Sequence, residues 1–166
     1  EGALPAGYAM SSGVGYGEHF TYPEDSGYCR AEVSNDNVLS VVPTQSAVGK
    51  TCRDAVETVP ALILDGQTQD LSGWTERNAR TCLGQSGRLE MLLLAVEGRN
   101  MGEALVGATL SECAEILSRH NAQQAVNLSG GNRAMLWYDG HYVLRGANPA
   151  TRESGGRALP NAFIYK

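Results

Sequence analysis

Lysine is almost absent from this chain of 166 residues, and long apolar runs are absent altogether. Lys50 and Lys166 are the two lysines beside eleven arginines, and the formal net charge at pH 7 is −5. An acidic chain is not expected to bind nucleic acid, because such binding depends on basic surface charge. The longest apolar run, Met91 to Val96, has the length of a strand and is too short to span a membrane. The arginines suit bidentate recognition of phosphate or carboxylate, or they reflect a GC-rich genome.

Histidine and cysteine are also scarce, with three and four residues. No C-x-x-C pair is present, so we expect no zinc site and no cofactor. The cysteines permit two disulfides, and the pairing we expect is Cys29–Cys52 and Cys82–Cys113. An even cysteine count in a chain that begins at Glu1 rather than Met favours a secreted or cell-surface protein. Four buried free thiols are the alternative.

The length predicts one domain, which we place at residues 8–166 behind an irregular N-terminal arm of residues 1–7. Short apolar segments bounded by turn residues predict several strands. The nearly continuous apolar run from Leu89 to Val96 is typical of a central strand covered on both faces. Residues 44–57 show no clear period and could hold a helical turn.

One helix is predicted firmly, at about residues 109–120. Thr109 and Glu112 have the spacing of a capping box. Apolar residues recur behind them at intervals of three and four, which gives one buried face. The overall prediction is an α+β fold with a mixed β-sheet packed against this one main helix.

The most informative stretch runs from Gln124 to Arg145. Asp139-Gly140 between two apolar runs predicts a β-hairpin with a tight turn. Gly130 and Gly131 lie just before it, and two adjacent glycines could direct backbone N–H groups toward an oxyanion or phosphate. A plain tight bend between strands is the alternative.

Several motifs follow one another in a distinctive order. Residues 125–133 read A-V-N-L-S-G-G-N-R, and residues 157–165 read R-A-L-P-N-A-F-I-Y. Upstream are N-A-R-T-C-L-G at 78–84, E-G-R at 97–99 and G-A-T-L-S-E-C-A at 107–114. In order and spacing these motifs resemble the phosphodiester glycosidase family. Its corresponding patterns are A-x-N-L-D-G-G-G-S-S, R-x-x-x-N-A, R-T-A-x-G, D-G-R and G-x-T-L-x-E-x-A.

The resemblance implies the phosphodiester glycosidase fold and removal of a sugar from a sugar-1-phosphodiester. The phosphate would need cationic or N–H partners, and the developing oxocarbenium ion would need a carboxylate. The catalytic candidates implied are Glu97, Arg80, Arg99, Asn127 and Ser129. The substrate-binding candidates are Gly130, Gly131, Asn132, Arg133, Arg157 and Asn161. We expect these groups to converge on the turn at residues 129–133, although Arg80 and the Glu97–Arg99 pair could also serve as structural braces.

The sequence departs from the family pattern inside the glycine turn. Ser129 replaces the Asp, Asn132-Arg133 replace Gly-Ser, and Ser11 would correspond to an Asn of an N-terminal motif. Serine cannot supply the lost negative charge. We therefore expect a degenerate site in an extracellular sugar-binding or structural module, rather than an efficient enzyme.

Two further interpretations stay open. An active hydrolase could use Glu97 as its carboxylate, and an intracellular domain would keep free thiols. Carbohydrate or a sugar phosphodiester is the expected ligand. A homo-oligomer or surface assembly through the 1–7 arm is the expected protein partner. Trp74, in a polar segment, could stack on a sugar ring or cover the edge of the core.

Overall fold

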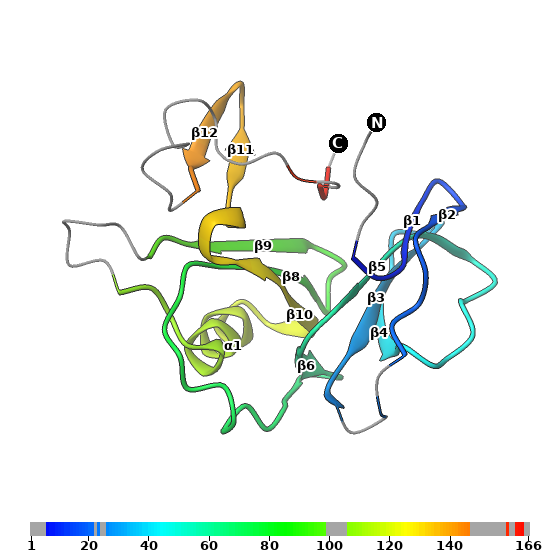
Figure 1. The fold of residues 1–166 in the computed structure, drawn as a ribbon, viewed down its shortest axis with the longest axis horizontal. Helices are drawn as coiled ribbons and strands as arrows, with labels where there is room; N and C mark the ends of the chain where they lie inside the picture. Colours follow the sequence, from blue (N-terminus) through cyan, green and yellow to red (C-terminus); the bar gives the residue numbers. More distant parts are fainter. Residues whose placement is uncertain are drawn as a thin grey trace.

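Within the described residues, the fold comprises two five-stranded sheets, one α-helix and a separate two-stranded hairpin (Figure 1). The computed structural model describes residues 6–21, 23, 26–98, 106–146, 159 and 162–164, and of Asn132 the backbone alone. Residues 1–5 of the predicted arm and most of the expected closing strand at 157–165 therefore lie outside the described residues.

The first sheet, sheet A, has the strand order β2-β1-β5-β3-β4. Its strands are β1 (Ala9–Ser11), β2 (Val14–Tyr16), β3 (Cys29–Ser34), β4 (Leu39–Pro43) and β5 (Cys52–Thr58). Every neighbouring pair is antiparallel. The helical turn expected within residues 44–57 is wrong, because most of β5 occupies this region and pairs with both β1 and β3.

The second sheet, sheet B, has the strand order β7-β6-β10-β8-β9. Its strands are β6 (Ala61–Leu64), β7 (Gln67–Thr68), β8 (Arg80–Ser86), β9 (Met91–Val96) and β10 (Ala122–Gly130). All of its pairs are antiparallel as well, so the predicted mixed sheet is corrected to two antiparallel sheets. The strand predicted as central is β9 at the edge, where Leu93 is 45% exposed.

Helix α1 (Leu110–Arg119) confirms the predicted helix and its start. The Thr109 side chain accepts a hydrogen bond from the Glu112 N–H, and the Glu112 carboxylate accepts one from the Thr109 N–H. This reciprocal cap satisfies two backbone donors that the first turn would otherwise leave unpaired. The buried face comprises Leu110, Cys113, Ala114 and Leu117.

Sheet B is the middle layer of the molecule. Cys82 and Ala125 face α1 in one core cluster, whereas their chain neighbours Leu83 and Val126 face sheet A in another. Successive residues of a strand point to opposite faces, which explains how β8 and β10 serve both clusters. Among the described residues, no helix is long and apolar enough to cross a membrane.

The predicted hairpin is confirmed as β11 (Leu136–Tyr138) and β12 (His141–Leu144). Asp139 and Gly140 form its turn with φ of 47° and 77°, both in the left-handed region. This is the geometry for which Asp-Gly is favoured in two-residue hairpin turns. The hairpin stands away from both sheets, beyond the end of β10 (Figure 1).

Candidate functional site

The register of sheet B brings several predicted site residues to one end of the molecule. Gly130 at the end of β10 is paired with Arg80 at the start of β8, and Arg80 is paired with Val96 at the end of β9. Glu97 follows Val96 directly. Because β8 runs antiparallel to both neighbours, Arg80, Glu97 and the glycine turn lie at the same end of the sheet. We call this the turn end of sheet B.

The two glycines of the turn are required for different structural reasons. A Cβ on Gly130 would lie 2.6 Å from the carbonyl oxygen of Ala79, so only glycine permits this close strand approach. Gly131 has φ of 59°, and a Cβ there would meet open space. Its N–H donates to the Ala79 oxygen at 2.9 Å. That N–H is therefore engaged within the protein and does not point freely toward an anion.

Ala79 is the point at which several chain segments meet. A Cβ on Gly98 would lie 2.9 Å from the Ala79 nitrogen, and a Cβ on Gly107 would lie 2.3 Å from the Asn78 carbonyl. Together with Gly130, these glycines come from three separate segments that all approach the backbone of Asn78 and Ala79. Close backbone packing thus fixes the turn end independently of any side chain.

Asn127 ties β10 to the connection between the two sheets. Its Nδ2 donates to the Val59 oxygen at 2.7 Å, and its backbone N–H donates to the Pro60 oxygen at 3.1 Å. The Thr58 hydroxyl donates to the Asn127 carbonyl. Asn127 is 8% exposed, and within the described residues its Oδ1 has no hydrogen-bond partner. The side chain thus braces the fold through its amide donor and keeps one unused acceptor.

Ser129 is fixed by its backbone, while its side chain remains available. The Thr81 hydroxyl donates to the Ser129 carbonyl at 2.6 Å, and the Ser129 N–H approaches the same hydroxyl oxygen at 3.3 Å. The Ser129 residue is half-buried, and in the described part of the chain its own hydroxyl makes no hydrogen bond. The position at which the family pattern has Asp is therefore held rigidly and presents a neutral hydroxyl.

Arg80 makes two backbone contacts in the structure. Its Nε donates to the Ala108 oxygen at 3.2 Å, and its Nη2 donates to the Glu76 oxygen at 2.7 Å. These bonds tie the start of β8 to the residue before the α1 N-cap. Within the described residues Nη1 is the guanidinium nitrogen without such a partner, so one donor group remains for a ligand.

A model of the phosphodiester glycosidase family matches residues 1–166. The chain belongs to this family. Among solved structures it is similar to the catalytic domain of zebrafish N-acetylglucosamine-1-phosphodiester alpha-N-acetylglucosaminidase, auto-inhibited by its pro-peptide, with 19% identity and a TM-score of 0.58. That match covers 79% of this chain and 47% of the zebrafish chain, so the present chain spans about half the length of that protein.

A hypothetical protein from Synechocystis matches at 19% identity and a TM-score of 0.44, over 75% of this chain and 32% of that one. No curated protein sequence matches the chain. The family model and the zebrafish structure confirm the resemblance seen in the sequence motifs. At this level of identity the structural match establishes the fold alone.

The remaining predicted site residues of this phosphodiester glycosidase family member are only partly placed. Glu97 is half-buried and Arg133 is exposed. Arg99, Arg157 and Asn161 lie outside the described residues, as does the side chain of Asn132. Their expected convergence on the turn stays a prediction, whereas Arg80, Glu97 and the two glycines are brought to one end by the sheet register.

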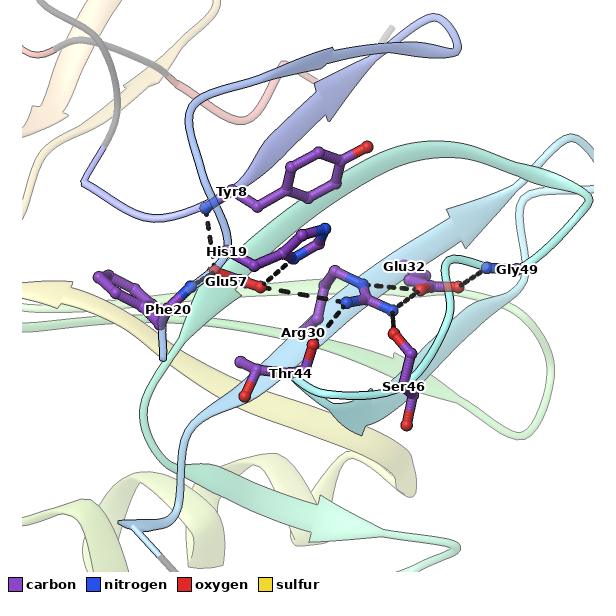
Figure 2. Close-up of polar contacts among 9 residues, drawn as sticks. All are labelled: Tyr8, His19, Phe20, Arg30, Glu32, Thr44, Ser46, Gly49 and Glu57. Carbon is purple, nitrogen blue, oxygen red and sulfur yellow. Dashed lines mark hydrogen bonds and ion pairs between the residues drawn. The ribbon is translucent and has the colours of Figure 1, made fainter. Parts of the chain in front are cut away.

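Sequence reasoning missed Thr58, Thr81 and Ala79, which hold the turn end through hydrogen bonds and close packing. It also missed a buried charge network on sheet A (Figure 2). Arg30 is fully buried, and its guanidinium bonds Glu32 Oε1 and the carbonyls of Thr44 and Ser46. The signal was present in β3, where Arg30 and Glu32 alternate with the apolar residues Cys29, Ala31 and Val33.

Glu57, paired with Arg30 in the sheet register, anchors the N-terminal segment. One of its carboxylate oxygens accepts the N–H groups of Tyr8 at 3.0 Å and Phe20 at 2.9 Å. The other lies 2.6 Å from His19 Nδ1 and 4.0 Å from Arg30 Nη1 (Figure 2). A single buried carboxylate thus fixes both ends of residues 8–20.

The four cysteines are free thiols in the structure. The predicted Cys29–Cys52 disulfide is excluded by the register, because Cys29 is opposite Thr58 and Cys52 is opposite Ser34 at the other end of the same strand pair. At about 3.3 Å per residue this separates them by roughly 20 Å, far beyond the reach of a disulfide. Cys82 and Cys113, by contrast, are neighbours in one core cluster, and their thiols are hydrogen-bonded.

The described residues contain no group of three or more His, Cys, Asp and Glu side chains that could hold a metal ion. A shallow polar concavity of about 320 Å³ is lined by Ser86, Gly87, Arg88, Glu90, Asn121 and Gln123. It lies at the opposite end of sheet B from the turn, because Ser86 ends β8 and Ala122 begins β10. It contains none of the family-motif residues, so the turn end remains the candidate site.

Proposed function

We propose that this domain binds a sugar-1-phosphodiester at the turn end of sheet B and hydrolyses it poorly. The observation that carries the proposal is the state of position 129. The family pattern has Asp there, whereas this chain has a Ser whose backbone is fixed by Thr81. The scaffold is thus retained and the charge is lost.

The missing charge matters because the transition state of glycoside cleavage resembles an oxocarbenium ion. A carboxylate aimed at the developing positive charge stabilises that state. For comparison, removing one preorganised hydrogen-bond donor from an oxyanion hole lowers kcat by about 10² to 10³. A neutral hydroxyl can still accept or donate a hydrogen bond to a sugar. Ground-state binding is therefore expected to survive better than catalysis.

An active hydrolase is the second candidate, and the position of Glu97 favours it. Glu97 follows the residue paired with Arg80 and so lies at the same end of the sheet as Ser129. In this alternative Glu97 supplies the carboxylate from a different strand.

The decisive experiment measures both sugar release and binding with methyl N-acetylglucosamine-1-phosphate, the substrate class named for the zebrafish enzyme. Wild type is compared with Ser129→Asp and with the nearly isosteric but neutral Ser129→Asn. We expect wild type to bind without appreciable turnover, Ser129→Asp to gain at least tenfold in kcat/KM, and Ser129→Asn to gain nothing. Turnover by wild type that is lost in Glu97→Gln would overturn the degenerate-site proposal and establish the alternative.

A secreted or cell-surface location, and assembly through residues 1–7, belong to the same proposal. The contact between the Cys82 and Cys113 thiols is compatible with an oxidising compartment. Secretion is tested by following the full-length natural protein in cell fractions, and assembly by comparing the sedimentation of this chain with that of a variant lacking residues 1–7. A cytoplasmic protein with reduced thiols would contradict the location.

A further inference from the structure

The β11–β12 hairpin exposes two large aromatic side chains. Trp137 is 58% exposed and Tyr138 is 70% exposed. The Trp137 and Tyr142 rings meet edge to face, with centroids 4.7 Å apart and planes at 87°. The Arg145 guanidinium lies over the Tyr142 ring at 5.4 Å. The indole is therefore held by a neighbouring ring while more than half of its surface remains open.

The hairpin projects from the candidate site rather than from an unrelated surface. The three-residue turn Gly131–Arg133 follows β10 directly, and β11 begins at Leu136 after Ala134, which is fully buried. Figure 1 shows the hairpin rising from this turn, away from both sheets. A ligand on the hairpin would thus lie beside the turn end of sheet B.

The chemistry of the exposed surface fits a sugar ring. The π face of an indole carries partial negative charge, and the C–H bonds on one face of a pyranose carry partial positive charge. Exposed polar groups of Asp139 and His141 lie at the tip of the same hairpin and can bond hydroxyl groups. A ring that is already fixed by Tyr142 loses little conformational freedom on binding.

The size of the hairpin argues against a protein partner. A stable protein interface usually involves about 20 to 30 residues on each side and roughly 800 Å² per partner. The hairpin spans nine residues, 136–144, and forms a sheet of its own. The hairpin is large enough to contact one or two pyranose rings, whereas a second protein would need a much larger contact area.

We infer that the β11–β12 hairpin is a carbohydrate-binding surface on which Trp137 stacks against a neutral pyranose ring of a glycan chain. This goes beyond the proposed phosphodiester site, because it needs neither a phosphate nor a carboxylate. The two sites are adjacent in the fold, so a glycan seated on Trp137 would lie next to the phosphodiester site at the turn.

The test uses ligand-observed saturation-transfer NMR and calorimetry with three neutral probes: N-acetylchitotriose, cellotriose and maltotriose. Trp74, the other tryptophan, is 39% exposed outside the hairpin and is the competing candidate for stacking on a sugar, so it provides the discriminating comparison. We expect at least one probe to bind wild type at millimolar concentration or better. Trp137→Ala should weaken that binding at least tenfold, Trp137→Phe should retain most of it, and Trp74→Ala should leave it unchanged.

Thermal unfolding of each variant checks that the fold is intact, as we expect for substitutions at exposed positions. The inference is overturned if no probe binds wild type, or if Trp74→Ala removes binding and Trp137→Ala does not. It is also overturned if sedimentation shows self-association that Trp137→Ala abolishes, because the hairpin would then meet a second copy. Since neutral sugars are used, failure here is distinct from failure of the phosphodiester proposal, which depends on Ser129→Asp.

Discussion

At the scale of single residues, Gly130 lies in a family motif, yet the structure already requires glycine at this position for close backbone packing. The Ala79 oxygen occupies the space that a Cβ would need, at 2.6 Å. Gly130→Ala should therefore destabilise the fold by about 1 to 3 kcal/mol, the usual cost of overpacking against an immobile neighbour. Denaturant unfolding measures the change.

Gly73→Ala is the matched control, because a Cβ at Gly73 meets no atom within 4 Å. It should change the free energy of unfolding by less than about 0.5 kcal/mol. Equal effects of the two substitutions would show that the close approach at Ala79 is not important. Gly131→Ala, at φ of 59° with open space around it, should cost about 1 kcal/mol from backbone strain alone.

We expect the buried carboxylate of Glu57 to contribute more to stability than an exposed ion pair does. Its carboxylate is buried, bonds two backbone N–H groups and His19, and faces the fully buried Arg30. Glu57→Gln replaces an acceptor by an amide donor that faces other donors, and it leaves Arg30 with one carboxylate partner fewer. The expected loss is about 3 to 5 kcal/mol, as for other broken buried pairs.

The control for Glu57 is Glu115→Gln in the exposed i,i+4 pair with Arg119. This pair should contribute at most about 0.5 kcal/mol. Hydrogen exchange at the Tyr8 and Phe20 amides adds a local readout, since both donate to Glu57. Unchanged protection of these amides in Glu57→Gln would contradict the anchoring role.

At the scale of elements, the sequence predicted the features that depend on a few consecutive residues. It failed for features that depend on which strands pair with one another. The capping box of α1 and the Asp-Gly turn of β11–β12 depend on a few consecutive residues, so the sequence alone located both. The position of β9 in its sheet depends on which strand covers it. Its apolar run faces α1 with Leu92, Leu94 and Val96, but none of the described strands lies beyond it.

The candidate site divides in the same way. The roles of Gly130, Gly131, Arg80 and Glu97 in a site stay a prediction. The motifs and the family resemblance selected these residues, and the register places them at one end of sheet B. The motifs could not predict Thr81 or Ala79, because these act through backbone contacts across strands. Their roles follow from register, which the sequence pattern does not encode.

The contact between β8 and α1 places two thiols where a disulfide can form. The Cys82–Cys113 hydrogen bond and then burial raise the pKa of Cys82, so this thiol is protonated at neutral pH. Incubation with an oxidised thiol reagent should nevertheless join the pair when the chain refolds, with loss of one hydrogen from each thiol. The cross-link closes a loop of about 30 residues and should stabilise the fold by about 3 to 4 kcal/mol.

Peptide mapping under non-reducing conditions identifies the bridge, and thermal unfolding with and without reductant measures its effect. Cys29 is the internal control: burial raises its pKa to about 12, and the register keeps it far from Cys52. A Cys29–Cys52 bridge in correctly folded protein would contradict the strand pairing described above.

At the scale of the whole molecule, sheet B packs against α1 on one face and against sheet A on the other. We therefore predict that the two sheets unfold as a single unit. Val126 is fully buried and packs with Leu83 and the β3 residues Cys29, Ala31 and Val33, so one side chain joins the two sheets. Val126→Ala should cost about 2 to 3 kcal/mol, from lost burial and the cavity left behind. Val14→Ala, at a site that is 54% exposed, should cost less than about 0.5 kcal/mol.

Native-state hydrogen exchange distinguishes this arrangement from two independently stable halves. If the sheets unfold together, Val126→Ala should lower protection by the same free energy in β3 of sheet A and in β8 of sheet B. Loss of protection in β8 alone would mean that sheet A is stable without its partner layer. Equal losses would mean that the turn end keeps its geometry only while sheet A is folded, since β5 ends at Thr58 and its hydroxyl holds the Asn127 carbonyl of β10.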